Sequence, residues 1–297
     1  MDHDYLKSIM YKIRNYEIRI RKAVNSQLKG NFTSLFKGCG LEFDDVRAYQ
    51  YGDDVRRIDW HVSAKGEDTY VKVFKEEKEQ TIFFLVDVSH SQSIGKEKYT
   101  KIELSREICS VLSLSAAKEE SEVGLICFSD RKEKYIEPDK GMKKAYEIML
   151  NLYRLVPESL KTDLDALIHF ALNLIKRRSI VVLISDFIDQ GYEESLKALA
   201  RKHDLIVIHV TDDTEKELPR LGIIPLIDKE SGEVHWVNTS SVAFQKRLLQ
   251  DFVNTQKNLE NLCLKYRANY LSVNTREDFV PKLVKLFKIR NRSARGV

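Results

Sequence analysis

Residues 81–91 read TIFFLVDVSHS, and this stretch decides the fold of the 297-residue chain. Its first part is a strand-length run of apolar side chains at successive positions, so both faces of the strand are expected to be buried. A carboxylate and two hydroxyls follow at once, on Asp87, Ser89 and Ser91. The stretch therefore predicts a buried parallel strand with polar side chains at its carboxyl end.

Strand and helix patterns alternate beyond this first strand. Helices are predicted over 100–118, 141–153, 162–177, 192–202, 242–267 and 279–288, and strands over 122–129, 179–185, 204–210 and 270–273, with a hairpin of 223–224 and 234–237 around a turn at 229–232. Such alternation specifies a mostly parallel sheet covered by helices on both faces. We expect residues 80–297 to form an α/β domain of doubly wound, Rossmann-type architecture.

The first 79 residues have a different texture. Residues 1–30 place apolar side chains at helical spacing among lysines and arginines, which predicts a basic amphipathic helix. Docking on the rest of the chain and contact with an anionic membrane surface both remain open for this helix and for the basic tail at 288–295. Residues 37–79 combine glycines, alternating aromatics and dense charge, and predict a small β-rich module.

Composition excludes several classes of protein. Forty-nine basic residues against 45 acidic ones give a net charge of +4, too balanced to indicate nucleic-acid binding. No apolar run approaches the roughly 20 residues that span a bilayer, so no integral membrane segment is expected. The N-terminus lacks the apolar block of a signal peptide, and the four cysteines are scattered. We therefore expect a cytoplasmic protein with reduced cysteines.

Oxygen donors from three stretches of chain are expected to meet at one edge of the sheet. Asp87, Ser89 and Ser91 lie two residues apart, a spacing that turns side chains to the same side. Asp186 directly follows the predicted strand 179–185, and Thr162 begins the helix that leads into that strand. Hard oxygens suit Mg²⁺, Mn²⁺ or Ca²⁺ rather than zinc. With only two carboxylates, such an ion would keep an open position for a carboxylate from another molecule.

Other interpretations compete with a metal-dependent binding site. Thr162 is a candidate helix cap, and the two serines are typical of turns. A metal at the paired aspartates, with His90 as a base, could instead hydrolyse a phosphoester, and a metal-free structural scaffold is the third alternative. The chain has no phosphate-binding loop, no nucleophile elbow and no zinc spacing. We therefore expect that the protein is not an enzyme.

The five site residues resemble a metal-ion-dependent adhesion site. Asp-x-Ser-x-Ser, a later threonine and an aspartate after a further strand form the pattern of von Willebrand factor A-like domains, whose members bind proteins through the ion. The upstream run GLEFDDVRAYQYGDDVRRIDWHVSAKGEDTYVKVFKEEKEQ at 40–80 also resembles the domain-of-unknown-function 58 family, as do KRRSIVVLISDF at 176–187 and the segment 202–219. The resemblance spans nearly the whole chain.

The resemblance implies partners. Members of this family are typically encoded beside MoxR-type AAA+ ATPases and are thought to act with them in chaperone-like maturation of protein complexes. The chain would then be an adaptor that binds such an ATPase and a client protein, the latter supplying an acidic residue to the ion. One departure lies next to the site, because many relatives follow the second serine with methionine and this chain has Gln92. That change removes no metal donor.

Overall fold

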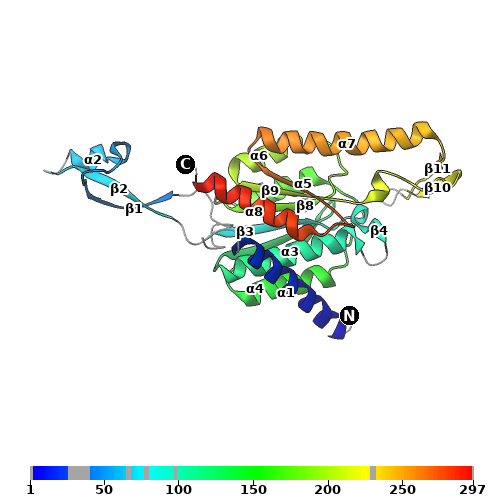
Figure 1. The fold of residues 1–297 in the computed structure, drawn as a ribbon, viewed down its shortest axis with the longest axis horizontal. Helices are drawn as coiled ribbons and strands as arrows, with labels where there is room; N and C mark the ends of the chain where they lie inside the picture. The colour runs from blue at the N-terminus through cyan, green and yellow to red at the C-terminus, as the bar shows by residue number, and fades with distance from the viewer. Residues whose placement is uncertain are drawn as a thin grey trace.

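The computed structural model describes residues 3–25, 41–64, 68–76, 80–96, 99–227 and 232–295. At its centre lies a six-stranded sheet in the order β12-β9-β8-β3-β6-β7 (Figure 1). The strands are β3 (Thr81–Asp87), β6 (Glu122–Phe128), β7 (Lys132–Asp139), β8 (Ile180–Ser185), β9 (Asp204–Thr211) and β12 (Asn269–Asn274). Neighbours run parallel except β7, which pairs antiparallel with β6. The predicted α/β class is confirmed, and β7 is a strand that the sequence analysis missed.

Helices cover both faces of this sheet because β3 is apolar on both sides. Ile82, Phe84 and Val86 pack in one buried cluster, whereas Phe83 and Leu85 belong to a second. The first cluster includes side chains of α1 (His3–Asn25), α3 (Lys101–Lys118), α4 (Met142–Arg154) and α8 (Phe279–Arg295). The second includes side chains of α5 (Leu164–Leu174), α6 (Glu193–Lys202) and α7 (Val242–Lys265). The sheet is therefore the middle of three layers.

The start of α5 differs from the prediction. The helix begins at Leu164 rather than at Thr162, and Asp163 caps it by accepting the Ala166 N–H at 2.8 Å. Because Asp163 directly precedes the helix and already satisfies a free helical N–H group, Thr162 is not needed as a cap. Thr162 lies in the preceding loop, partly exposed. The interpretation of Thr162 as a helix cap is therefore weakened relative to its interpretation as a metal ligand.

Helix α1 docks on the sheet domain. Ile13 is fully buried, and the Tyr16 ring meets Phe279 of α8 edge-on at 4.9 Å between centroids. Glu17, 1% exposed, accepts two hydrogen bonds from Lys118 of α3 at 2.6 and 2.7 Å. The docked interpretation of the basic helix is therefore the one observed over its described side chains. Contact of its outer face with a membrane stays a prediction, and residues 26–30 lie outside the described part.

A small antiparallel module precedes the sheet. Strands β1 (Leu41–Ala48) and β2 (Tyr70–Glu76) pair with one another, and the short helix α2 (Trp60–Ser63) lies between them in sequence. Figure 1 shows this module standing out at one end of the molecule. Its ion pairs are internal, with Arg47 bound to Asp53 through two hydrogen bonds of 2.7 and 2.8 Å. Among the described residues, no ion pair joins this module to the sheet domain.

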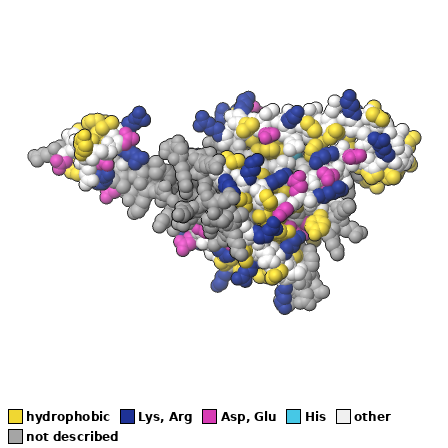
Figure 2. All heavy atoms as spheres, viewed as in Figure 1, with side chains coloured by type: hydrophobic (Ala, Val, Ile, Leu, Met, Phe, Trp, Pro, Cys, Tyr) yellow, Lys and Arg dark blue, Asp and Glu magenta, His cyan; other side chains and the backbone are white. Residues whose placement is uncertain are grey.

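A second hairpin projects at the opposite end. Strands β10 (Ile223–Ile227) and β11 (Val234–Asn238) pair antiparallel as predicted, and residues 228–231 of the turn lie outside the described part. Its outer side chains are exposed, and Figure 2 shows hydrophobic side chains gathered at this end, with basic and acidic ones interspersed elsewhere on the viewed face. Among the described helices, none combines the length and apolar character needed to cross a bilayer.

Candidate metal centre

Three stretches of chain are joined at the carboxyl ends of β3 and β8. The loop after β3 contacts the loop before α5, because His90 N–H donates to the Leu160 carbonyl at 3.0 Å. The start of α5 in turn contacts the loop after β8, with Leu164 N–H 2.7 Å from Asp189 Oδ2. From β3 the chain crosses to β6 on one side and later returns to β8 on the other. This reversal of strand order is where open α/β sheets bind their ligands.

The Asp-x-Ser-x-Ser loop forms a compact group of oxygens. Asp87 Oδ1 accepts the Ser89 N–H at 2.9 Å, which folds the loop back over the end of β3. The hydroxyl oxygens of Ser89 and Ser91 lie 2.9 Å apart. Neighbouring ligands of an octahedral Mg²⁺ ion, each 2.0–2.1 Å from the metal, are also separated by about 2.9 Å. The donor type and the spacing of the two hydroxyls therefore fit a small divalent cation.

Asp87 is a buried carboxylate without a cationic partner. It is 1% exposed and accepts hydrogen bonds from Ser185 Oγ at 2.7 Å and Gln92 Nε2 at 3.3 Å, both on Oδ2. No lysine or arginine in the described part of the chain forms an ion pair with it. Burial, and next the negative charge of Asp186, raise the pKa of Asp87 to about 6. A bound cation would relieve this uncompensated charge.

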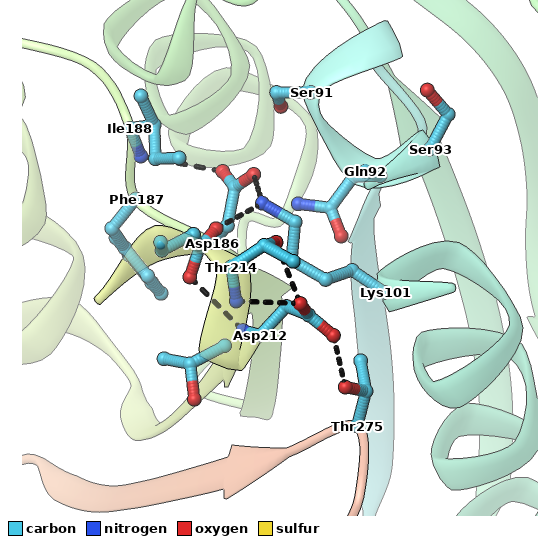
Figure 3. A network of polar contacts seen from close by, with 12 residues as sticks. Ser91, Gln92, Ser93, Lys101, Asp186, Phe187, Ile188, Asp212, Thr214 and Thr275 are labelled. Atoms are coloured by element: carbon cyan, nitrogen blue, oxygen red, sulfur yellow. Dashed lines mark hydrogen bonds and ion pairs between the residues drawn. The ribbon is translucent and has the colours of Figure 1, made fainter. Parts of the chain in front are cut away.

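Asp186 is in a different situation, because it already has a cation. Lys101 Nζ lies 2.5 Å from Asp186 Oδ2 and 2.5 Å from Glu215 Oε1, and the lysine is completely buried. Figure 3 shows the lysine ammonium beside the Asp186 carboxylate. The other oxygen of Asp186 accepts the Ile188 N–H at 3.2 Å. Both oxygens of this predicted ligand thus have donors from the chain itself.

Local backbone geometry fixes the direction of both side chains. Phe187 has a positive φ of 54°, rare for a bulky residue, and its N–H donates to Ser185 Oγ at 3.0 Å. Gly95, with a φ of 137°, lies in the short strand β4 (Gly95–Lys96), which pairs antiparallel with β5 (Tyr99–Thr100), and an added Cβ there would come within 2.6 Å of the Tyr99 carbonyl oxygen. This close pairing returns the chain so that Lys101 N–H donates to the Ile94 carbonyl at 3.0 Å. Lys101 is thereby placed beside the site.

The polar network continues to the ends of β9 and β12. Glu215 accepts the Asp212 N–H at 3.0 Å, and Asp212 in turn accepts hydrogen bonds from Thr214 and from the Thr275 hydroxyl (Figure 3). A cavity of about 350 Å³ opens beside this end of the network, with Asp212 and Thr275 in its wall. Lys101 and its partners therefore connect the carboxyl ends of β8, β9 and β12, and the hydrogen bond from Ser185 to Asp87 joins β3 to β8.

The predicted site residues do not all occupy equivalent places. Asp87, Ser89 and Ser91 come together, and Asp186 lies close enough to influence Asp87 electrostatically. Thr162 lies two residues from Leu160, which contacts the serine loop. The donors are nearly enclosed, because Asp87 and Asp186 are each 1% exposed and Ser89 is 3% exposed. In the described part of the chain no cluster of three or more His, Cys, Asp or Glu side chains has metal-binding geometry.

Four further residues of the site were not predicted. Ser185 donates to Asp87, and Lys101 pairs with Asp186 and with Glu215. Gln92 adds a completely buried side chain whose Oε1 has no hydrogen-bond partner among the described residues. Ser185 directly precedes Asp186, so its place beside Asp87 follows once β3 and β8 are known to be neighbours. One local feature of the sequence pointed to Lys101, because a lysine in the first turn of a helix opposes the helix dipole.

A mostly parallel sheet covered on both faces, with an Asp-x-Ser-x-Ser loop at the carboxyl end of a central strand, defines a von Willebrand factor A-like domain. Domains of this class are typical protein-interaction modules. Residues 45–258 match the family described as protein of unknown function DUF58, and the chain belongs to this family.

Uncharacterized proteins resemble the chain over almost their whole length. One from Mycobacterium bovis and one from Mycobacterium tuberculosis are each 25% identical over 289 residues, which cover 95% of this chain and 90% of theirs. Similar solved structures include BatB from Bacteroides thetaiotaomicron, with 15% identity, a TM-score of 0.43 and coverage of 72% of this chain and 99% of BatB. The VWA domain of SpRpn10 has 14% identity, a TM-score of 0.36 and coverage of 69% and 93%.

Proposed function

We propose that the chain is a metal-dependent protein-interaction module that acts in the cytoplasm as an adaptor for a MoxR-type AAA+ ATPase, in chaperone-like maturation of protein complexes. The observation that carries the metal is Asp87, a buried carboxylate that has hydroxyl neighbours and no cationic partner among the described residues. Burying an unpaired charge is costly, and it persists where function requires it. The partner ATPase comes from the family resemblance.

Each predicted ligand has a role in this proposal. Asp87, Ser89 and Ser91 would hold Mg²⁺ or Mn²⁺, with Thr162 contributing from the loop before α5. Asp186, whose two oxygens accept from Lys101 and the Ile188 N–H, would add negative charge beside the ion. A bound ion supplies a Lewis-acidic position at which an acidic side chain of a client protein binds. The chain's own residues orient the hydroxyls and exclude bulk water, since Asp87 and Ser89 are nearly buried. Charge-assisted contacts formed in such an enclosed place are stronger than the same contacts in water.

Binding rather than catalysis is the proposed activity. Among the described residues, the side chains that hydrogen-bond Asp87 are serines and Gln92, and neither type is a usual general base. His90 uses its backbone N–H to join the loop before α5 and leaves its side chain partly exposed. General base catalysis needs a side chain within hydrogen-bond reach of the attacking water. The arrangement supports capture of a ligand more than its turnover.

The test is retention of an AAA+ ATPase by immobilised protein from cell extract. We expect wild type to retain the ATPase in Mg²⁺ and to lose it in chelator, and Asp87→Asn to retain about tenfold less in Mg²⁺ because one carboxylate ligand is gone. Asp165→Asn, which removes a partly exposed carboxylate near the start of α5, is the matched control and should behave as wild type.

Two results would contradict the proposal. Retention that ignores both chelator and Asp87→Asn would indicate a metal-free scaffold. Turnover of p-nitrophenyl phosphate by wild type, lost in Asp87→Asn and kept in Asp165→Asn, would indicate a phosphoester hydrolase instead.

A further inference from the structure

Lys101 occupies a place that is doubly unfavourable for a positive charge. Its side chain is 0% exposed, and it is the first residue of α3, where the helix dipole opposes a cation. Burial would lower the pKa of Lys101, but the charges of Asp186 and Glu215 outweigh burial and leave that pKa raised. The ammonium is therefore a fixed charge of the interior, held by two carboxylates.

The positive charge of Lys101 does not compensate the three nearby carboxylates equally. Lys101 is shared between Asp186 and Glu215, at 2.5 Å from each, while Asp87 receives only neutral donors. Gln92 donates from its side-chain nitrogen to Asp87, and its buried Oε1 has no hydrogen-bond partner among the described residues. One cation thus serves two of the three carboxylates, and the remaining negative charge lies on the side of the two serines.

We propose that Lys101 is an internal counter-ion that competes with a divalent metal for Asp186, and that it thereby sets how tightly the edge binds metal. This inference rests on the metal dependence proposed above and adds its regulation. With the ammonium on Asp186, the ion is held by Asp87, Ser89 and Ser91. Without the ammonium, Asp186 becomes a second carboxylate ligand, and hard divalent ions bind more tightly as charged oxygens are added.

A purely structural ion pair makes a different prediction. If Lys101 only neutralises buried carboxylates, removing it should change the stability of the fold. Metal affinity should then depend only on the net charge of the cluster. The chain offers a way to separate net charge from access to Asp186. Replacing Lys101 and Glu215 together by Met and Gln removes one positive and one negative charge, so the net charge of the cluster stays the same while Asp186 is released.

The experiment measures Mn²⁺ binding to the full chain by electron paramagnetic resonance of the free ion. We expect Lys101→Met/Glu215→Gln to bind Mn²⁺ about tenfold more tightly than wild type, because Asp186 gains access to the ion. Glu215→Gln alone removes negative charge and leaves the ammonium on Asp186, so it should bind more weakly than wild type. Adding Asp87→Asn to the double variant should abolish the gain, which places the ion at this edge.

Each outcome has a separate meaning. Mn²⁺ binding by wild type that is equal or stronger than binding by the double variant overturns the inference and leaves the proposed metal dependence intact. Binding by the double variant but not by wild type would show that the lysine competes for Asp186, and it would overturn the metal dependence proposed for the wild-type chain. Absence of binding by both chains at about 10 mM Mn²⁺, weaker than the weakest protein Ca²⁺ sites, overturns the metal dependence and the inference together.

A second pair of variants keeps Lys101 and serves if the double variant does not give the wild-type circular dichroism spectrum. Asp186→Asn and Glu215→Gln each remove one carboxylate from the ammonium, so they match in charge and differ in distance from Asp87. If the ammonium holds Asp186 away from the ion, the two should lower Mn²⁺ affinity equally, within about threefold. A loss more than about tenfold greater in Asp186→Asn would show that Asp186 is a ligand despite Lys101, and the inference would be wrong.

Discussion

The buried ionisable side chains of this protein are accommodated in different ways. Lys101 keeps its charge because two carboxylates surround it, and Asp87 keeps an ionisable group beside hydroxyls without any basic neighbour in the described part. His203 is held neutral instead. It is 2% exposed, its Nδ1 accepts the Ser179 N–H at 3.3 Å, and burial followed by nearby Lys202 and Arg178 lowers its pKa to about 4.

The neutral His203 predicts a specific loss of stability in acid. An unfolded histidine titrates near pH 6.5, above the folded pKa, so the unfolded chain binds more protons as the pH falls through this window. The contribution of His203 is therefore complete above about pH 6.5 and is lost towards pH 4, by roughly 2 kcal/mol between pH 7 and pH 5. His203→Asn keeps an acceptor for Ser179 and cannot titrate. Urea unfolding at the two pH values should give a smaller difference for the variant than for wild type.

An equal difference for wild type and His203→Asn would show that other groups cause the acid sensitivity. His169→Asn is the control, because that histidine is exposed on α5 and should leave the pH dependence unchanged.

Sequence patterns found the part of the site that depends on local spacing. Asp87, Ser89 and Ser91 lie on one short loop, so alternation alone predicted that they share a side. Lys101 was missed because its burial depends on Glu215, which lies 114 residues away, and on the tight turn at Gly95. Thr162 was assigned to a helix end, although Asp163 is the better cap by one residue. Contacts between residues far apart in the sequence decide which oxygens of the site remain available to a ligand. No local sequence pattern predicts these contacts.

Among the helices, α1 shows most clearly that the role of a helix depends on the elements it packs against. It lies on α3 and α8, and Ile13 is fully buried there whereas Tyr11 is 71% exposed. Ile13→Ala should lower the free energy of unfolding by about 2–4 kcal/mol, since a buried isoleucine leaves a cavity when truncated. Tyr11→Ala should change it by less than about 0.5 kcal/mol. Chemical denaturation of both variants measures the difference.

Similar small effects of the two substitutions would mean that α1 is not part of the folded sheet domain in solution. Lys118→Met offers an independent check, because it removes an ion-pair partner of the buried Glu17 and should be destabilising for the same docked helix.

Periodicity predicted most elements and missed those with mixed signals. Strands β3, β6, β8 and β9 are buried on both faces, so continuous apolar runs identified them. Strand β7 reads KEKYIEPD and is an antiparallel edge strand with only Ile136 buried, so its charged, outward-facing side chains concealed it. Edge strands are often charged in this way, because charge prevents pairing with other chains. The sequence therefore predicts a core strand better than an edge strand.

Ion binding and the stability of the whole folded molecule should be linked through Asp87. An ion that binds only the folded chain stabilises it by mass action, by about 1.4 kcal/mol when the free ion is ten times its dissociation constant. For a domain of this size that corresponds to a rise in melting temperature of roughly 3 °C. The unmatched charge of Asp87 opposes folding in the absence of an ion, since the folded pKa is raised above the unfolded one and the carboxylate is ionised at neutral pH.

Asp87→Asn should therefore reverse the response to metal. In chelator at pH 7.5 the variant is expected to melt at or above the wild-type temperature, because a neutral amide replaces a buried carboxylate that has no cation. In Mn²⁺ the wild type should gain stability and the variant should not, so the two melting temperatures approach or cross as the ion is added. Thermal melts followed by circular dichroism over a Mn²⁺ titration measure this. Equal stabilisation of the variant would place the ion elsewhere, and a less stable variant in chelator would mean that the hydrogen bonds from Ser89 and Ser185 already compensate the charge of Asp87.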